Sequence, residues 1–280
     1  MSVLVFDSGM GGLSIFRELR LRLPQQSFIY VGDDAGFPYG DWDEQSLANR
    51  IVGIFERLLM QYQPQIAIVA CNTASTLILP ALREKFDIPF VGTVPAIKPA
   101  ALRTASGLIT LLGTPGTISR DYTKNLITQF ASSVEVQLVG ARDLAKIAED
   151  YLLQRSWDET LLQAELAPCF VEKNGLRTDI VILGCTHYPF LANQMRKIAP
   201  WPVDWIDPAE AIASHAQRLL SNDSVDPDQS SAGENHVKQN QTPEHDLAIT
   251  TSSQIQPAAT RLLHSFGLKT CSMPELLEPV

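Results

Sequence analysis

Short apolar runs alternate with helical patterns along most of the chain. Residues 3–6 form a buried-strand run, and after a glycine-rich turn Leu13, Phe16, Leu19 and Leu23 recur at helical spacing. Strands that alternate with helices in this way form parallel sheets covered by helices on both faces. The pattern therefore predicts an α/β fold with doubly wound, mainly parallel sheets. Further strands are predicted at residues 27–31, 66–70, 90–92, 108–112, 134–139, 180–183, 203–206 and 247–250.

Two helices have clear sequence signals. Residues 43–62 carry one apolar stripe, and Asp43 is suited to cap the first turn because a carboxylate there accepts from free backbone N–H groups. Residues 256–266 predict a final helix after the strand at 247–250. We also expect a helix rich in Ala and Leu after the strand at 66–70.

Two segments of the chain repeat. Residues 4–9 resemble residues 110–115, and residues 66–71 resemble residues 180–185 at a nearly equal separation. In the second pair each copy ends in a cysteine that is followed by a polar residue. Parallel strands in general look alike, but this shared ending favours a duplicated α/β unit. The repeat predicts two pseudo-symmetric domains, with Cys71 and Cys185 at corresponding carboxyl ends of strands and the active site between the domains.

One stretch departs from the alternation. Residues 221–246 contain six acids, one lysine and few apolar side chains. Such a segment cannot bury enough apolar surface to offset the entropy lost on ordering it. We predict a mobile acidic surface loop and interpret it as a tolerated insertion rather than a regulatory element.

Composition narrows the class of protein. The 280 residues include 22 Lys plus Arg and 31 Asp plus Glu, giving a formal net charge of −9, with 45% apolar residues. An acidic chain without clustered basic residues argues against nucleic acid as a partner. The sequence has neither an apolar run long enough to span a membrane nor a basic start typical of a signal peptide. We therefore expect a cytoplasmic protein whose cysteines are free thiols.

The two strand-end cysteines are candidates for chemistry. Cys71 and Cys185 each precede a helical segment, and a helix N-terminus is expected to lower the pKa of a thiol. The hydroxyl and amide side chains that follow them suit a small anion such as a carboxylate. Cys169 lies in a helical stretch and Cys271 near the C-terminus, neither within a constellation of site-like polar residues, so both are assigned to packing. No CxxC pair or Cys/His ligand spacing occurs, and no metal site is predicted.

The glycine-rich turn at residues 7–12 does not have the spacing of a dinucleotide fingerprint, and no P-loop lysine follows it. Its backbone N–H groups still suit an anion, while Asp7 either meets an ammonium group, orients a proton-transfer group or caps the next helix. His187, two residues after Cys185, is placed to hydrogen-bond a thiolate, although an isolated histidine is more often structural.

Two thiols from two similar halves fit one class of reaction. One thiolate removes a proton from one face of a carbon, and a thiol on the opposite face returns one. The roles exchange when the reaction runs backwards, so the site needs a nearly symmetric acid and base. The thiol is suitable because its ordinary pKa of about 8.5 lies near neutrality.

These residues also resemble a known family. The segments that carry the resemblance are FDSGMGGL at 6–13, FPYG at 37–40, CNTAS at 71–75, GTPGT at 113–117 and LGCTHYP at 183–189. Together, and in this order, they are similar to the cofactor-independent glutamate racemases, which supply D-glutamate for peptidoglycan. The match runs from residue 3 to about residue 207, with a looser match beyond it.

The resemblance implies roles for individual residues. Cys71 and Cys185 would be the two acid/base residues, assisted by Asp7 and His187, and Glu149 matches a glutamate of the family although its surroundings differ. No cofactor is expected, glutamate is the expected small-molecule partner, and a homodimer is allowed. The substrate site would be lined by Asp7, Ser8, Tyr39, Gly40, Asn72, Thr73, Thr114, Thr117, Thr186 and His187.

The predicted division places residues 1–94 and 208–280 in a first domain and residues 95–207 in a second. Two alternatives stay open at this point. One is an aspartate racemase, which uses the same chemistry in a smaller pocket. The other is a non-catalytic protein in which the repeated turns bind an anion and the cysteines only pack.

Overall fold

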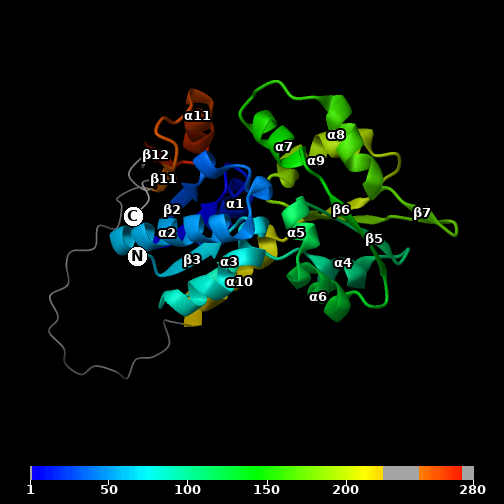
Figure 1. The fold of residues 1–280 in the computed structure, drawn as a ribbon, viewed down its shortest axis with the longest axis horizontal. Coiled ribbons are helices and arrows are strands. Elements are labelled where there is room, and N and C mark those ends of the chain that lie inside the picture. The colour runs from blue at the N-terminus through cyan, green and yellow to red at the C-terminus, as the bar shows by residue number, and fades with distance from the viewer. Residues whose placement is uncertain (1, 223–245, 273–280) are drawn as a thin grey trace.

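The computed structural model describes residues 2–222 and 246–272, which form two mainly parallel sheets side by side (Figure 1). The first sheet has six strands, all paired in parallel. In spatial order they are β12 (Lys269–Ser272), β11 (Leu247–Thr250), β2 (Ser27–Gly32), β1 (Ser2–Asp7), β3 (Ile66–Val69) and β4 (Phe90–Gly92).

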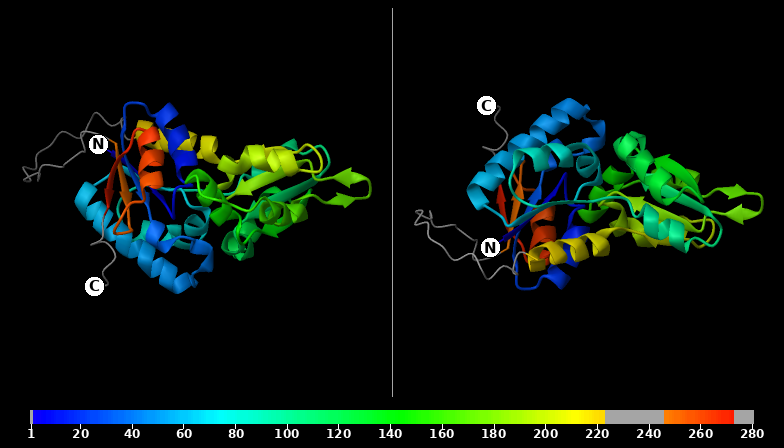
Figure 2. Two further views of the ribbon diagram at one scale, coloured as in Figure 1. Left: turned by 90° about the horizontal axis from the view of Figure 1, so that it is seen from above. Right: turned by 90° about the horizontal axis from the view of Figure 1, so that it is seen from below.

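The second sheet has four strands, also paired in parallel. Beside it a short antiparallel hairpin is formed by β7 (Glu172–Lys173) and β8 (Leu176–Arg177). Figure 2 shows the two sheets in two lobes from opposite sides. In spatial order the four strands are β10 (Asp204–Ile206), β9 (Ile180–Gly184), β5 (Leu108–Gly113) and β6 (Glu135–Gly140).

The predicted repeat is confirmed at the level of strand order. The first sheet contains the order β2-β1-β3-β4 and the second the order β6-β5-β9-β10. The strands that resemble each other in sequence, β1 with β5 and β3 with β9, therefore occupy corresponding positions. The α/β fold class predicted from the alternation is confirmed.

Helices cover both faces of each sheet (Figures 1 and 2). Those on the six-stranded sheet are α1 (Leu13–Arg22), α2 (Glu44–Tyr62), α3 (Asn72–Lys85), α10 (Ala209–Asn222) and α11 (Pro257–Ser265). Those on the four-stranded sheet are α4 (Ile97–Arg103), α5 (Pro115–Ser119), α6 (Asp121–Phe130), α7 (Leu144–Leu152), α8 (Glu159–Leu166) and α9 (Ala192–Ile198). Short 3-10 turns are η1 (Asp34–Gly36), η2 (Tyr39–Asp41), η3 (Ala167–Cys169) and η4 (Tyr188–Leu191). None of the helices in the described part of the chain is long and apolar enough to cross a membrane.

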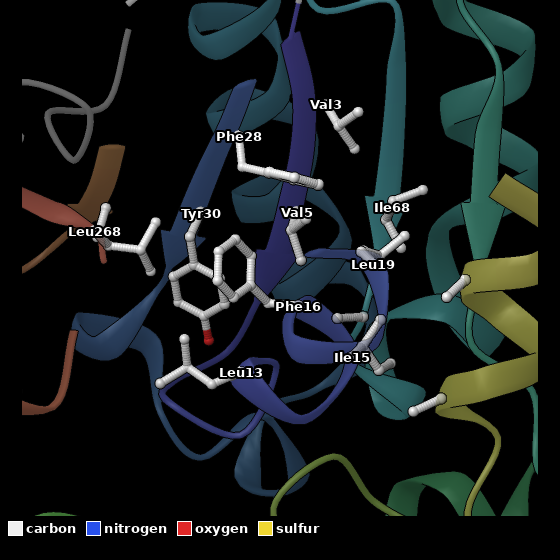
Figure 3. Packing of buried hydrophobic residues seen from close by; sticks show 14 of the residues in the cluster. Val3, Val5, Leu13, Ile15, Phe16, Leu19, Phe28, Tyr30, Ile68 and Leu268 are labelled. Carbon is white, nitrogen blue, oxygen red and sulfur yellow. The ribbon is translucent and has the colours of Figure 1, made fainter. Parts of the chain in front are cut away.

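The core of the first sheet follows from the alternation of side chains along a strand. Val3 and Val5 of β1 pack with α1, α10 and α11, as Figure 3 shows for part of this cluster. Leu4 and Phe6 point to the other face and pack with α2 and α3. Each such fully buried side chain contributes roughly 1.5 to 3 kcal/mol. The rigid core therefore fixes the position of Asp7, the last residue of β1, and of the turn that follows it.

Helix starts and ends agree closely with the sequence. Asp43 caps α2, its carboxylate accepting from the Ser46 N–H at 2.9 Å. The final helix, predicted at 256–266, is α11, with Gln256 and Phe266 as its two caps. The strands β7, β8 and β12 were not predicted, because they are only two to four residues long and lack an apolar run.

Two sequence predictions are wrong, one about the bounds of the acidic loop and one about the burial of a cysteine. The predicted loop at 221–246 is too long, because Ser221 belongs to α10 and Asp246 is buried, accepting from the Phe28 N–H at 2.8 Å and pairing with Arg20. Residues 223–245, the rest of that loop, lie outside the described residues. Cys271, assigned to packing, is exposed because it lies on the edge strand β12. Cys169 is buried in the core of the second sheet as expected.

The chain crosses between the two sheets close to the predicted domain boundaries. The chain leaves the six-stranded sheet after β4, builds the four-stranded sheet from β5 to β10 and returns with α10 and β11. The division at residues 94/95 and 207/208 falls in these two crossings and stays a prediction.

Candidate active site

Two cysteines lie at corresponding ends of the two sheets. Cys71 follows β3 at the N-cap position of α3, and Cys185 directly follows β9. Their side chains are buried, with 5% and 8% of the residue exposed. As the repeat predicts, one thiol comes from each sheet.

The surroundings of Cys71 favour the protonated form of its side chain, the thiol. Its sulfur lies 3.7 Å from the Ser8 hydroxyl. Burial and, to a smaller extent, the nearby Asp7 carboxylate raise the pKa of the Cys71 thiol from its ordinary value of 9.0 to about 12, against the lowering effect of the Ala74 N–H. The prediction that the helix N-terminus lowers this pKa is wrong, because the loss of hydration outweighs the N–H groups of α3.

Cys185 is the first member of a chain of three side chains. Its sulfur lies 3.8 Å from Nδ1 of His187, and Nε2 of the same ring lies 2.8 Å from a carboxylate oxygen of Glu149. Burial lowers the pKa of His187, but its bonds to Cys185 and Glu149 and their negative charges raise it well above the usual value. The His187 ring therefore lies between a sulfur and a carboxylate, and both neighbours favour its protonated form. Glu149 comes from α7 and is buried.

The turn after β1 makes close contact with this chain of side chains. The Met10 N–H donates to the Glu149 carboxylate at 3.2 Å, and the Gly11 N–H also lies 3.2 Å from Nε2 of His187. A protonated Nε2 can only donate, so with the imidazolium the bond to Glu149 is made and the Gly11 N–H is a close neighbour. A Cβ at Gly11 would lie 2.2 Å from Nδ1 of His187, so only glycine fits here.

Asp7, the last residue of β1, directly precedes this turn and bridges the two sheets. Its carboxylate accepts from the Gly9 N–H and from the Thr186 hydroxyl, both at 3.1 Å. Burial raises the pKa of Asp7, against the opposing effects of His187 and these hydrogen bonds. Because the carboxylate spans the turn after β1 and the residue after Cys185, it fixes the two strand ends relative to each other.

Asn72 presents an unused amide to the site. The residue is 2% exposed, and neither its Nδ2 nor its Oδ1 has a hydrogen-bond partner in the described structure. The same holds for the hydroxyl of Thr93, which follows β4. Asn72 and Thr93 line one small cavity together with Cys185 and Thr186. Since buried polar groups in folded proteins are normally paired, these groups are suited to a ligand.

Three hydroxyl groups meet where the sheets approach each other. Thr73 Oγ1 lies 2.9 Å from Thr114 Oγ1 and 3.4 Å from Thr117 Oγ1, and the last two are 3.1 Å apart. Gly40 lies beside them, since a Cβ there would be 3.9 Å from Cβ of Thr114. The Tyr39 hydroxyl is engaged elsewhere, donating to the Asp33 carboxylate at 2.6 Å.

The larger cavities lie outside this group. One of about 310 Å³ is lined by Met10, Phe37 and Glu149, but neither Cys71 nor Cys185 lines it. Within residues 2–222 and 246–272, no cluster of three or more His, Cys, Asp or Glu side chains is arranged to hold a metal ion.

Comparison with known proteins identifies the family. The family model described as Asp/Glu/Hydantoin racemase matches residues 14–216. A glutamate racemase of Brucella canis is 53% identical over 268 residues, covering 95% of this chain and 92% of the relative. The chain belongs to the Asp/Glu/hydantoin racemase family. It is therefore an enzyme, a racemase, which sets aside the non-catalytic alternative.

Solved racemase structures have the same fold. The Escherichia coli glutamate racemase, crystallised with L-glutamate and the activator UDP-MurNAc-ala, is 38% identical with a TM-score of 0.82, each chain being covered to 97%. A glutamate racemase isoform of Bacillus anthracis is 25% identical with a TM-score of 0.76, over 99% of this chain and 98% of the other.

The sequence analysis identified neither Thr93 as a site residue nor Asp33 as the hydrogen-bond partner of the Tyr39 hydroxyl. Thr93 directly follows β4, so the rule that located Cys71 at the carboxyl end of β3 applies to it as well. The carboxylate that accepts from Tyr39, that of Asp33, also pairs with Arg50 at 2.5 Å. The two residues are 17 positions apart in the sequence, one on a turn and one on a helix, and no sequence pattern predicts their contact.

Proposed function

We propose that this racemase interconverts L- and D-glutamate without a cofactor, using Cys71 and Cys185 as the two acid/base residues. The observation that carries the proposal is a pair of buried thiols at corresponding ends of two sheets, one beside an imidazolium and the other beside a hydroxyl. The names of the relatives at 53% and 38% identity support glutamate as the substrate.

In the proposed reaction, glutamate binds with its α-carbon between the two sulfurs. With Cys185 as thiolate, its lone pair takes the α-proton, and the electrons of the C–H bond pass to the α-carbon and its carboxylate. The Cys71 thiol then gives its proton to the opposite face. The product has inverted configuration, and the two sulfurs have exchanged protonation states. The reverse direction uses the same groups in exchanged roles.

The surroundings support unequal resting states for the two sulfurs. The His187 ring, whose pKa is raised, lies 3.8 Å from the Cys185 sulfur, where a positive charge would pair with the thiolate of the proposed reaction, and Glu149 in turn favours that positive charge. Cys71, with its raised pKa of about 12, is a thiol before substrate binds. The substrate ammonium group would favour ionisation of Cys71 when the reaction runs in the other direction.

The polar groups around the sulfurs would bind the substrate. Asn72, Thr73 and Thr186 are assigned to the α-carboxylate and ammonium group, with Asp7 facing the ammonium. Asn72 offers the strongest support, because its buried amide has no partner within the described structure. The side-chain carboxylate would be left to backbone donors, and Ser8, Tyr39, Gly40, Thr114 and Thr117 would line the rest of the substrate site.

The test is racemisation of glutamate in D₂O. The wild type should convert L-glutamate to D-glutamate with one solvent deuterium at the α-position of the inverted product. Cys71→Ser and Cys185→Ser should each abolish racemisation, whereas Cys169→Ser, a matched change at another buried thiol, should retain it. Full activity in either of the first two variants would refute the two-cysteine mechanism.

The same assay with aspartate decides the substrate. We expect kcat/KM for glutamate to exceed that for aspartate, and a preference for aspartate would overturn the assignment. As part of the proposal, the enzyme supplies D-glutamate for peptidoglycan in the cytoplasm, and a homodimer is allowed. Sedimentation analysis tests the homodimer.

A further inference from the structure

Arg120 connects the two halves of the site from outside the catalytic group. It lies between α5 and α6, and its side chain reaches across to α3 and α2 of the other sheet. Its Nη1 donates to the Thr73 carbonyl and, at 2.6 Å, to the Thr76 hydroxyl. Its Nε donates to the Glu44 carboxylate at 3.2 Å.

The location of these acceptors is informative. Thr73 and Thr76 lie in the first two turns of α3, the helix that starts directly after Cys71. Arg120 directly follows α5, the short helix that begins after Thr114 and contains Thr117. One guanidinium group therefore ties together the two turns whose hydroxyl groups meet at the site.

Burial makes these bonds strong. The Arg120 side chain is only 11% exposed, whereas its counter-ion Glu44 is 69% exposed. Hydrogen bonds from a charged donor to a partly buried carbonyl are stronger than those between neutral groups. The exposed Glu44 contributes little, because water screens it. Most of the interaction therefore lies between Arg120 and α3.

We propose that Arg120 is a positioning residue that sets the distance between the first turn of α3 and the turn at 114–117, and thereby the affinity for substrate. It does not touch the reacting atoms. Without Arg120 the distance between the first turn of α3 and the turn at 114–117 would vary. The three hydroxyl groups and the amide of Asn72 would then have to be ordered by the substrate on binding. This proposal rests on the proposed function for its kinetic readout only.

The variants are Arg120→Ala, Arg120→Lys and Thr76→Val. We expect Arg120→Ala to raise KM about tenfold or more for both enantiomers of glutamate while kcat changes less than about threefold. Arg120→Lys should recover part of the loss, because an ammonium group replaces some of the donors. Thr76→Val should raise KM less, and its effect should largely disappear in the Arg120→Ala background, since both remove the same bond.

Two controls separate positioning from folding. Lys124→Ala removes an exposed cation of the next helix, which pairs only with Asp121 in the described structure, and should leave KM unchanged. Guanidinium at millimolar concentration should lower the KM of Arg120→Ala without affecting that of Lys124→Ala. A rescue of this kind is not expected of a variant that has merely lost stability.

Hydrogen–deuterium exchange gives a readout without substrate. In Arg120→Ala the peptides that cover residues 72–79 and 114–123 should exchange faster than in the wild type, while those of β1 stay protected. Unchanged exchange in both peptides overturns the proposal, whatever the enzyme does with glutamate. In an enzyme that racemises glutamate, an unchanged KM overturns it as well. An inactive wild type refutes the proposed function instead and leaves exchange to decide the role of Arg120.

Discussion

Ionisation of Cys71 should couple the stability of the enzyme to alkaline pH. In the unfolded chain this thiol loses its proton near its ordinary pKa of 9.0, whereas in the folded protein burial keeps it protonated up to about 12. Between these values the native state binds more protons than the unfolded state. The free energy of unfolding must therefore fall as the pH rises through this window.

The size of the effect follows from the two pKa values. At pH 10 the unfolded thiol is about 90% ionised, which favours unfolding by about 1.4 kcal/mol relative to pH 7.5. Replacement by serine, which does not ionise in this range, removes this contribution. The unfolding free energy of Cys71→Ser should thus fall by about 1.4 kcal/mol less than that of the wild type between pH 7.5 and pH 10.

Urea denaturation at the two pH values measures the difference. Cys169→Ser should behave like Cys71→Ser, because burial also raises the pKa of Cys169 to about 12. Cys271→Ser, at an exposed site, is the matched control and should keep the wild-type dependence. Comparing the change with pH cancels the constant cost of each substitution. If Cys71→Ser and the wild type lose stability in parallel, the thiol is not buried as described.

Three further substitutions test the surroundings of the site. Gly11→Ala should reduce racemisation at least tenfold, because its Cβ would lie 2.2 Å from the ring of His187, and the urea midpoint should fall by an amount corresponding to about 1 to 3 kcal/mol. Glu149→Gln should lower the raised pKa of His187 in an NMR titration. In the wild type the raised pKa of His187 stabilises the folded state fully below about pH 6.5, and this contribution is lost as the pH rises through the raised value. The contribution should be smaller in Glu149→Gln. Asp33→Asn should reduce the unfolding free energy by about 3 kcal/mol, since Arg50 loses a buried carboxylate. An unchanged titration, midpoint or activity in the respective variant would count against each contact.

The sequence predicted those parts of the structure that depend on local patterns. Strands such as β1 and β3 are apolar runs buried on both faces, so their bounds to within one residue and the cysteine after β3 could be predicted from the sequence. The matching order of the two sheets followed from the repeat. Side-chain contacts between elements that are distant in sequence could not be predicted, as the partners of Arg120 and Asp33 show. These contacts depend on how two helices or turns approach in space, and polar side chains carry no periodicity that would reveal it.

The candidate site divides in the same way. Glu149 was a candidate from the resemblance alone, and its contact with His187, at 2.8 Å, is known only from the structure. The pKa of Cys71 was misjudged because the position at a helix start is visible in sequence, whereas the degree of burial depends on packing against residues distant in sequence, such as Tyr39 and Ile249. Thr93 was overlooked because its hydroxyl becomes notable only when it has no partner.

The strand order of the first sheet has a consequence for synthesis of the chain on the ribosome. β2 pairs with β11, which is translated more than 200 residues later, after every strand of the second sheet. At about 5 to 20 residues per second, β2 waits roughly 10 to 40 s for this neighbour. Its edge stays open during that time, available for wrong pairing with other nascent chains. The four-stranded sheet, formed from one continuous segment, can fold during this interval, and we expect chaperone dependence to be governed by the delay at β2.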